Sequence, residues 1–130
     1  MINVSLLSAV ALAAMLAAAP ACADDGFAAF HADFRAAMAR DDGDAADAVI
    51  ALTRFPFLFE GSGHDAAGFR RAVWPVLFTP ALRRCWARAR ALSEPGQPGE
   101  WSLHCAPYAL HFDAEGGRWQ LREFSADPGQ

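Results

Sequence analysis

The sequence predicts an α+β protein in which N-terminal helices pack on a curved antiparallel sheet, after a signal peptide. Three observations predict this class. Residues 6–19 form a predominantly apolar run, apolar residues between positions 26 and 92 recur every three or four positions, and residues 101–124 alternate between apolar and polar. A helix repeats about every 3.6 residues and a strand about every two, so the helices come first and the sheet follows. The 130 residues suit a single domain.

Residues 1–23 are predicted to be the signal peptide, which leaves residues 24–130 as the domain. The leader carries no charged side chain, and its apolar run is shorter than the roughly 20 residues that a membrane helix needs. Ala21-Cys22-Ala23 then supplies the small-x-small pattern of a cleavage site. Cleavage after Ala23 places the domain in the periplasm or outside the cell, with no membrane span left. An uncleaved anchor and a buried helix are the alternatives.

The cysteines bear on both export and folding. Lipoprotein signals place a cysteine after small residues, so lipid attachment at Cys22 is another alternative, although Ala19-Pro20-Ala21 lacks the usual leucine. Cleavage leaves Cys85 and Cys105, an even pair that predicts a disulfide in an exported chain. Both fall on apolar faces, one of a helix and one of a strand, so the bond would join helix to sheet. The alternative is two separate buried thiols.

The charge balance excludes nucleic acid as an expected partner. The chain carries 15 acidic and 11 basic side chains, a net charge of −4, and every basic residue is arginine. Nucleic-acid-binding domains concentrate positive charge instead. Four arginines lie mostly off the apolar stripe of the helix predicted after Thr79: Arg83, Arg84, Arg88 and Arg90. They form either a solvated basic face or a patch for an anionic partner.

The first half of the domain has the spacing of helices. A helix predicted over residues 26–40 carries Phe27, Phe30 and Phe34 on one face. A second helix is predicted to begin at Asp44, whose carboxylate can accept hydrogen bonds from the free N–H groups of the first turn. These two helices precede every predicted strand.

Prolines divide the segment that follows. Residues 55–59 predict a short edge strand, which a turn at residues 61–63 ends. Asp65 is predicted to cap a helix that Pro75 interrupts. A further helix is predicted to begin at Thr79, whose hydroxyl can act as the cap for a first turn that contains a proline.

Alternating residues predict three strands in the last third of the chain. Residues 114–117 predict a hairpin turn between the last two strands. A symmetric turn there pairs Phe112 with Trp119 and Tyr108 with Glu123, and a slip by one residue would turn one strand inside out. The strands are centred on residues 101–105, 108–112 and 119–123.

Two or three N-terminal helices, a short strand, another helix and a C-terminal antiparallel meander thus follow one another. Gly117-Arg118-Trp119-Gln120-Leu121 ends this order with a G-x-W-x-[LI] pattern. Order and pattern resemble the nuclear transport factor 2-like superfamily, also called the cystatin-like cone fold, over most of residues 24–130. The resemblance implies that sheet and helices enclose a conical pocket. Members include isomerases, dehydratases, transport factors and exported domains of unknown role, and no catalytic motif of the superfamily maps onto this chain.

Within such a cone, the candidate ligand-binding residues are Phe30, Phe34, Tyr108, Trp119 and Glu123. Tyr108 and Glu123 also form the candidate catalytic pair, since both are polar residues on the apolar faces of their strands. An apolar surface disfavours the charged form of a carboxyl, which suits a group that transfers a proton, and a tyrosine beside it can donate to an oxyanion. The alternative is that Glu123 reaches water and Tyr108 lies at the rim.

The histidines and Ser62 do not by themselves indicate a catalytic or metal site. His31 lies near the apolar stripe of the first helix. It is either a hydrogen-bonded residue at the edge of the core or a base that accepts a proton. His104 and His111 lie on adjacent strands, but a metal site needs three or four ligands. Ser62 lacks the G-x-S-x-G spacing of a hydrolase elbow. We therefore expect no metal and no cofactor.

The sequence favours an exported domain that binds a small apolar ligand or a protein of the cell envelope without catalysis. The 10 phenylalanines and 4 tryptophans motivate this expectation. The first alternative is a cone-fold isomerase or lyase that uses Glu123 and Tyr108. The second is an immunity-type protein that neutralises its partner. A homodimer formed through the open sheet is compatible with all three.

Overall fold

The computed structural model describes residues 23–97 and 99–127. Its helical elements are α1 (Ala23–Met38), α2 (Asp42–Ala51), α3 (Ala66–Gly68), the π-helical turn η1 (Phe69–Val73), α4 (Trp74–Leu77) and α5 (Pro80–Arg88). Its strands are β1 (Phe57–Phe59), β2 (Ser62–His64), β3 (Leu92–Ser93), β4 (Glu100–Cys105), β5 (Tyr108–Glu115) and β6 (Arg118–Ala126).

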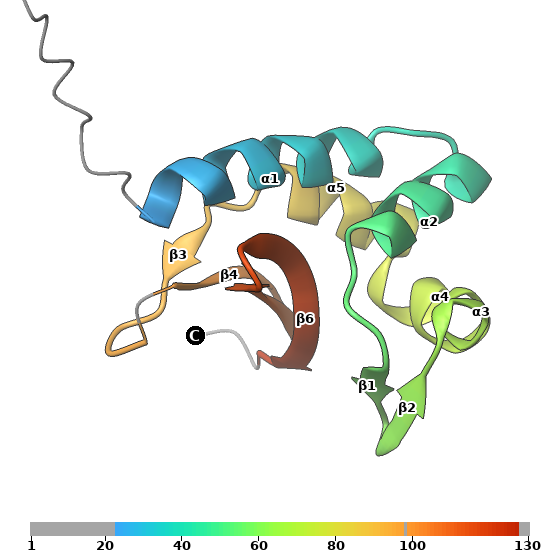
Figure 1. Cartoon of the computed structure of the whole chain (residues 1–130). Coiled ribbons are helices and arrows are strands. Elements are labelled where there is room, and N and C mark those ends of the chain that lie inside the picture. Colours follow the sequence, from blue (N-terminus) through green and yellow to red (C-terminus); the bar gives the residue numbers. More distant parts are fainter. Residues whose placement is uncertain (1–22, 98, 128–130) are drawn as a thin grey trace, which may run out of the picture.

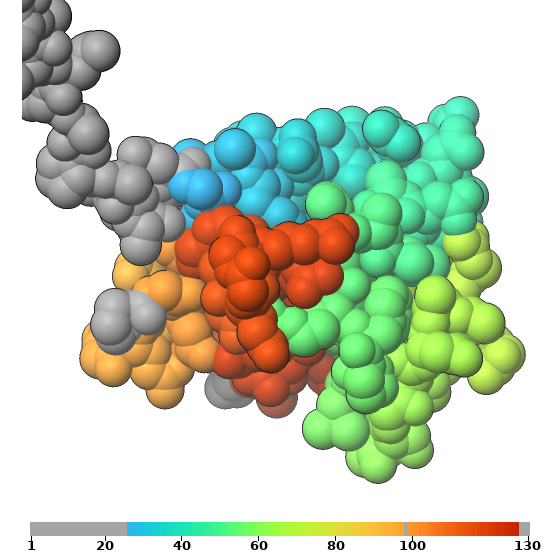
Figure 2. Space-filling view, viewed as in Figure 1, coloured from blue at the N-terminus to red at the C-terminus, as the bar shows by residue number. Residues whose placement is uncertain are grey.

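Helices come first and a curved antiparallel sheet follows, which confirms the predicted α+β class and order. α1 and α5 lie over one side of the sheet (Figure 1). The hairpin of β1 and β2 projects from one corner of the molecule (Figure 2). The predicted leader lies outside the described residues except for Ala23, the first residue of α1, and so does Cys22. Among the described helices, none has the length and apolar character that a membrane crossing requires.

The apolar face of α1 forms one wall of the core. Phe27, Phe30 and Phe34 are buried, as their spacing predicts. The ring of Phe112 on β5 contacts all three, with centroid distances of 6.0, 5.5 and 5.1 Å respectively. These contacts fix α1 across the sheet.

Three local predictions need correction. α2 begins with Asp41 at its N-cap, so Asp44 lies inside the first turn, where the helix dipole also favours a carboxylate. Residues 62–64 form β2, because the chain turns earlier, at Glu60-Gly61, where both residues have positive φ. Pro75 does not interrupt the helical segment, because it lies in the first turn of α4, where its missing N–H is not needed.

The capping residues predicted for the later helices are confirmed. Asp65 Oδ1 accepts a hydrogen bond from the Gly68 N–H at 2.8 Å. Thr79 Oγ1 accepts one from the Leu82 N–H at 3.2 Å, and Pro80 follows in the first turn of α5. α3 and α5 therefore begin where their sequence signals place them.

Thr79→Ala is expected to lower the free energy of unfolding by about 1 kcal/mol, because it leaves the N–H of Leu82 without its acceptor. Urea denaturation of both proteins measures the difference. Thr79→Ser keeps the hydroxyl and is the matched control, expected within about 0.5 kcal/mol of the original protein. Equal losses in the two variants would contradict a capping role.

The second sheet is a meander in the order β3-β4-β5-β6. The alternating pattern predicts three of these strands and misses β3, whose two residues, Leu92 and Ser93, are too few to carry a period. β3 pairs with β4 and adds an edge strand to the sheet.

The β5–β6 hairpin has a different register from the predicted one. Gly116-Gly117 forms the turn, and both residues have positive φ, of 63° and 78°. Such a two-residue turn is tighter than a symmetric turn over residues 114–117. Phe112 therefore faces Leu121, and the predicted pairing of Phe112 with Trp119 is wrong.

A β-bulge in β6 separates Glu123 from Tyr108. Arg122 is the extra residue, and it shifts the alternation by one, so Phe124 faces the core where Glu123 was predicted. Glu123 pairs with His111 on the polar face of the sheet. Tyr108 packs on the core side, with its ring 6.1 Å from that of Phe124. The predicted Tyr108–Glu123 pair is thus wrong, because the two side chains lie on opposite faces.

Cys85 on α5 and Cys105 on β4 form the predicted disulfide, with Cα atoms 6.1 Å apart. The bond joins helix to sheet. Next to Cys85, Trp86 is fully buried and its indole N–H donates to the Leu77 carbonyl at 2.8 Å. α5 is therefore held both by a covalent bond and by an anchored side chain.

Candidate functional site

A groove of about 380 Å³ lies where α1, the end of α5 and β4 meet, and we call it the arginine groove. Its lining residues are Phe27, Ala28, His31, Arg35, Arg88, Ala89, Arg90, Ala91 and Trp101. α1 supplies one wall and residues 88–91 supply another. No carboxylate is among these lining residues.

Stacked rings form the apolar part of the groove. The ring of Phe27 stacks on that of Trp101, with centroids 4.7 Å apart and planes 7° from parallel. It also stacks on His31 at 5.4 Å. Phe27 itself is buried, whereas Trp101 and His31 are half-buried. These two rings therefore bring aromatic surface to the groove while Phe27 fixes their orientation.

Three arginines supply the charge of the groove. Arg35 on α1 donates from Nε to the Ala87 carbonyl at 3.0 Å, which ties α1 to the last turn of α5. Arg35, Arg88 and Arg90 make no ion pair with any carboxylate among the described residues. Four arginines elsewhere do pair with carboxylates: Arg54, Arg70, Arg83 and Arg122. The positive charge of the groove is thus not neutralised by those described carboxylates.

His31 adds an unused polar atom. Its Nε2 is buried and has no hydrogen-bond partner within the part of the chain that the structure describes. Burial, and to a smaller degree the charge of Arg35, lower the pKa of His31 below its ordinary value of 6.5. The imidazole is therefore neutral at pH 7, and its buried Nε2 has no partner among the described residues, so His31 contributes its ring surface to the groove.

A neighbouring groove of about 410 Å³ shares Arg88 and Ala89 with the first. Arg84, the disulfide residue Cys85 and His104 also line it. Three of the four arginines predicted to lie off the apolar stripe thus line two adjoining depressions, namely Arg84, Arg88 and Arg90. The fourth, Arg83, pairs with Asp42 instead.

The predicted cone residues do not form one site. Phe30 and Phe34 belong to the core, and Phe34 has no exposed surface, so neither a cleft nor an internal cavity reaches its ring. Tyr108 and Trp119 are half-buried and pack against the core. Glu123 lies on the polar face of the sheet. None of the five lines the arginine groove.

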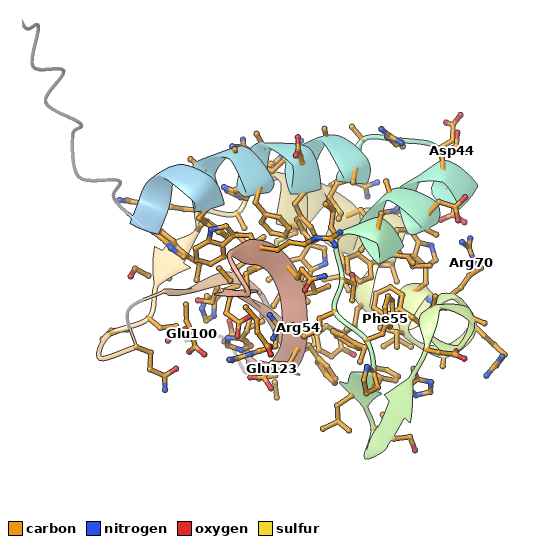
Figure 3. All side chains as sticks on the ribbon, viewed as in Figure 1. Asp44, Arg54, Phe55, Arg70, Glu100 and Glu123 are labelled. Carbon is orange, nitrogen blue, oxygen red and sulfur yellow. A yellow bond between two sulfur atoms is a disulfide. The ribbon has the colours of Figure 1, made fainter. Side chains whose placement is uncertain are left out.

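The polar face of the sheet carries a charge network around Arg54 and Arg122. Figure 3 labels three of its members, Arg54, Glu100 and Glu123. Arg54 pairs with Asp113, and Arg122 pairs with Glu100, with Asp113 at 3.1 Å and with Glu123 at 2.8 Å. Burial opposes the charged form of Arg122, but the hydrogen bond with Glu100 and the surrounding carboxylates outweigh it and raise its pKa. Because each of these carboxylates has an arginine partner, we assign the network a structural role in holding the bulged strand.

Ser102, His104 and Asp127 are hydrogen-bonded in the order of a hydrolase triad. The distances are 2.9 Å from Ser102 Oγ to His104 Nε2 and 2.9 Å from His104 Nδ1 to Asp127 Oδ2. Such a relay activates a serine that a substrate can reach. Ser102 has no exposed surface, so no electrophile can approach its oxygen. The array instead ties β4 to the residue that follows β6.

The two strand histidines do not converge on a metal site. His111 Nε2 lies 2.7 Å from Ser125 Oγ, whereas His104 bonds to Ser102 and Asp127. Among the described residues, no group of three or more potential ligands is arranged to hold a metal ion.

Comparison with known proteins identifies no relative: no protein family, no curated protein and no solved structure matches the chain.

Sequence reasoning missed the arginine groove as a site. Arg88 and Arg90 carried a detectable signal, because they lie off the apolar stripe of the helix predicted after Thr79. Phe27 and Trp101 had the pattern of core residues, and nothing in the sequence indicated that α1 and β4 would bring them together. The groove depends on contacts between residues about 70 positions apart, which a periodic pattern does not encode.

Proposed function

We propose that this protein is an exported binding domain of the nuclear transport factor 2-like superfamily that holds a small ligand with an apolar body in the arginine groove. The observation that carries the proposal is the groove itself. Its volume of about 380 Å³ falls in the range of roughly 300–1,000 Å³ typical of small-molecule sites, as do the 410 and 320 Å³ of the other two depressions, so its aromatic lining distinguishes it. Its aromatic surface, held by the Phe27–Trp101 stack, suits an apolar ligand body.

The order of elements supports the superfamily. Two helices, a β-hairpin, further helices and a four-stranded meander follow one another, with α1 over one side of the sheet. The rings of Phe30, Phe34 and Phe112 occupy the space between α1 and β5. The proposal therefore places the ligand in the arginine groove and not between helix and sheet.

Two features support export. The Cys85–Cys105 disulfide is typical of oxidising compartments. Residues 1–23 have the apolar run and small-x-small pattern of a cleaved leader. The proposal places the mature domain in the periplasm or outside the cell.

The groove suits binding better than catalysis. Its charged groups are arginines, which stay protonated near neutral pH and so do not act as acid–base groups. The isomerase or lyase alternative needed Glu123 beside Tyr108, and these side chains lie on opposite faces of the sheet. We therefore propose a domain whose task is to hold its ligand.

Native mass spectrometry of the full chain, exported to a bacterial periplasm, tests this proposal. We expect a chain that begins at Asp24 and carries a non-covalent small-molecule adduct. Trp101→Ala removes one ring of the stack and is expected to weaken the affinity for the adduct severalfold, up to about tenfold, since an aromatic pair contributes about 0.5–1.5 kcal/mol. The adduct-bearing fraction should therefore fall. Leu58→Ala is the control, because Leu58 is exposed on the β1–β2 hairpin, outside the groove.

Three results would contradict the proposal. A bare mass for the original protein, together with no binding of added octanoate or 1-octanol, would show that the groove holds no small ligand. A co-purifying protein in place of a small molecule would make the partner a protein. An unprocessed leader or an acylated Cys22 would contradict release as a soluble domain.

A further inference from the structure

We infer that the ligand of the arginine groove is an organic anion, with a carboxylate head held by the arginines and an apolar body on the aromatic surface. This inference rests on the proposed function, because it names the chemical class of the ligand for the same site. Three observations carry it: the positive charge of the lining side chains, the lack of ion pairs between the groove arginines and described carboxylates, and the position of these arginines on two walls.

The charge of the groove runs against that of the whole protein. The chain has a net charge of −4, yet the groove is lined by Arg35, Arg88 and Arg90 and by no acidic residue. A third depression, between α1 and α2, has both Asp33 and Arg40 in its lining. An excess of one sign in a depression with apolar walls favours a ligand of the opposite sign.

The guanidinium groups have capacity left for a ligand. Arg35 uses Nε on the Ala87 carbonyl, and no other hydrogen bond from its side chain to a described residue is present. Arg88 and Arg90 make no side-chain hydrogen bond or ion pair with the described residues. A guanidinium can donate two parallel hydrogen bonds to one carboxylate, which makes a carboxylate a fitting head group.

The arginines come from two walls of the groove. Arg35 extends from α1, whereas Arg88 ends α5 and Arg90 lies in the link to β3. The carbonyl end of α5 carries about half a negative charge, which acts against an anion. Two of its carbonyls are already engaged, that of Ala87 by Arg35 and that of Cys85 by the Ala89 N–H. Three full positive charges therefore outweigh the helix end.

The apolar lining explains why the ligand is more than an inorganic ion. Trp101 presents ring surface, and Ala28, Ala89 and Ala91 add small apolar side chains. A sulfate or phosphate ion would leave this surface in contact with water, whereas a hydrocarbon chain covers it and gains the free energy of burial. The ring of His31 adds aromatic surface, whereas its Nε2 is buried and does not face the ligand.

Isothermal titration calorimetry with three octyl compounds tests whether the groove prefers a negatively charged head group. Octanoate, 1-octanol and octylammonium share one chain and differ in charge. At pH 7 and low ionic strength, we expect octanoate to bind at least about tenfold more tightly than octanol, since a hydrogen bond to a charged group contributes about that factor. Octylammonium is expected to bind most weakly. Added salt should weaken octanoate binding and leave octanol binding unchanged.

Substitutions of single arginines test whether the groove arginines cause the preference for octanoate over octanol. Arg88→Gln and Arg90→Gln are each expected to weaken octanoate binding about tenfold and to leave octanol binding unchanged. Arg71→Gln is the matched control, because Arg71 is exposed on η1, makes no ion pair with the described residues and does not line the groove. It should bind octanoate as the original protein does.

The outcomes separate this inference from the proposed function. Equal affinities for octanoate and octanol, or unchanged octanoate binding in both groove variants, would overturn the anionic ligand and leave a site for apolar molecules. No binding of any octyl compound, together with a bare native mass, would overturn the proposed function itself.

Discussion

Replacing Phe34 by alanine is expected to lower the free energy of unfolding by about 3–5 kcal/mol. The ring has no exposed surface and lies between helix and sheet. Its centroid is 5.1 Å from that of Phe112 on β5 and 6.1 Å from that of Phe30. Removing the ring loses both its burial and its contacts, and a helix held across a sheet cannot close the space fully. Urea denaturation followed by circular dichroism measures the loss.

Two further variants serve as controls for the effect of Phe34→Ala on stability. Leu58→Ala removes an apolar side chain that is 60% exposed, and we expect it to change the free energy of unfolding by less than about 0.5 kcal/mol. Phe34→Leu keeps part of the volume and should give an intermediate loss, which is measurable even if Phe34→Ala does not fold. A Phe34→Ala loss no larger than that of Leu58→Ala would show that the ring is not part of the core.

The sequence predicts the helical half of the fold well because its signals are local. The spacing of Phe27, Phe30 and Phe34 depends only on the geometry of one helix. Capping by Asp65 and Thr79 depends on atoms three residues away. Such signals need no knowledge of what packs against the helix. Pro75 was misread because a proline is compatible with a first helical turn as well as with a helix end.

Strand register depended on two details that alternation alone does not reveal. The Gly116-Gly117 dipeptide is itself a strong signal for a two-residue turn, since both positions need positive φ. The apolar pattern of β6 then breaks by one residue, from Leu121 to Phe124, which is what a bulge at Arg122 produces. Read together, these features place Glu123 on the polar face. Strict alternation instead predicts that Glu123 faces Tyr108, which is the basis of the catalytic hypothesis.

The arginine groove required knowledge of tertiary contacts. Arg35 lies on the first helix, Arg88 on the last, and Trp101 on a strand that follows a proline- and glycine-rich loop. Only the packing of α1 against α5, together with the Phe27–Trp101 stack, brings these residues to one place. A basic face on one helix was predictable, whereas the aromatic surface opposite it was not.

Removing the disulfide is expected to lower the free energy of unfolding by about 3 kcal/mol. Cys85 and Cys105 are 20 positions apart, and their bond restricts the unfolded chain while it joins α5 to β4. The double variant Cys85→Ala/Cys105→Ala removes the bond without leaving free thiols. Chemical denaturation with and without a reductant measures its contribution.

The reductant supplies the internal control for this experiment. It should destabilise the original protein by about as much as the double substitution does, and it should leave the double variant unchanged, because no bond is left to reduce. Because α5 also carries Arg88, the bond fixes one wall of the arginine groove relative to Trp101 on β4. An unfolding free energy that neither the reductant nor the double substitution changes would show that the bond does not stabilise the fold.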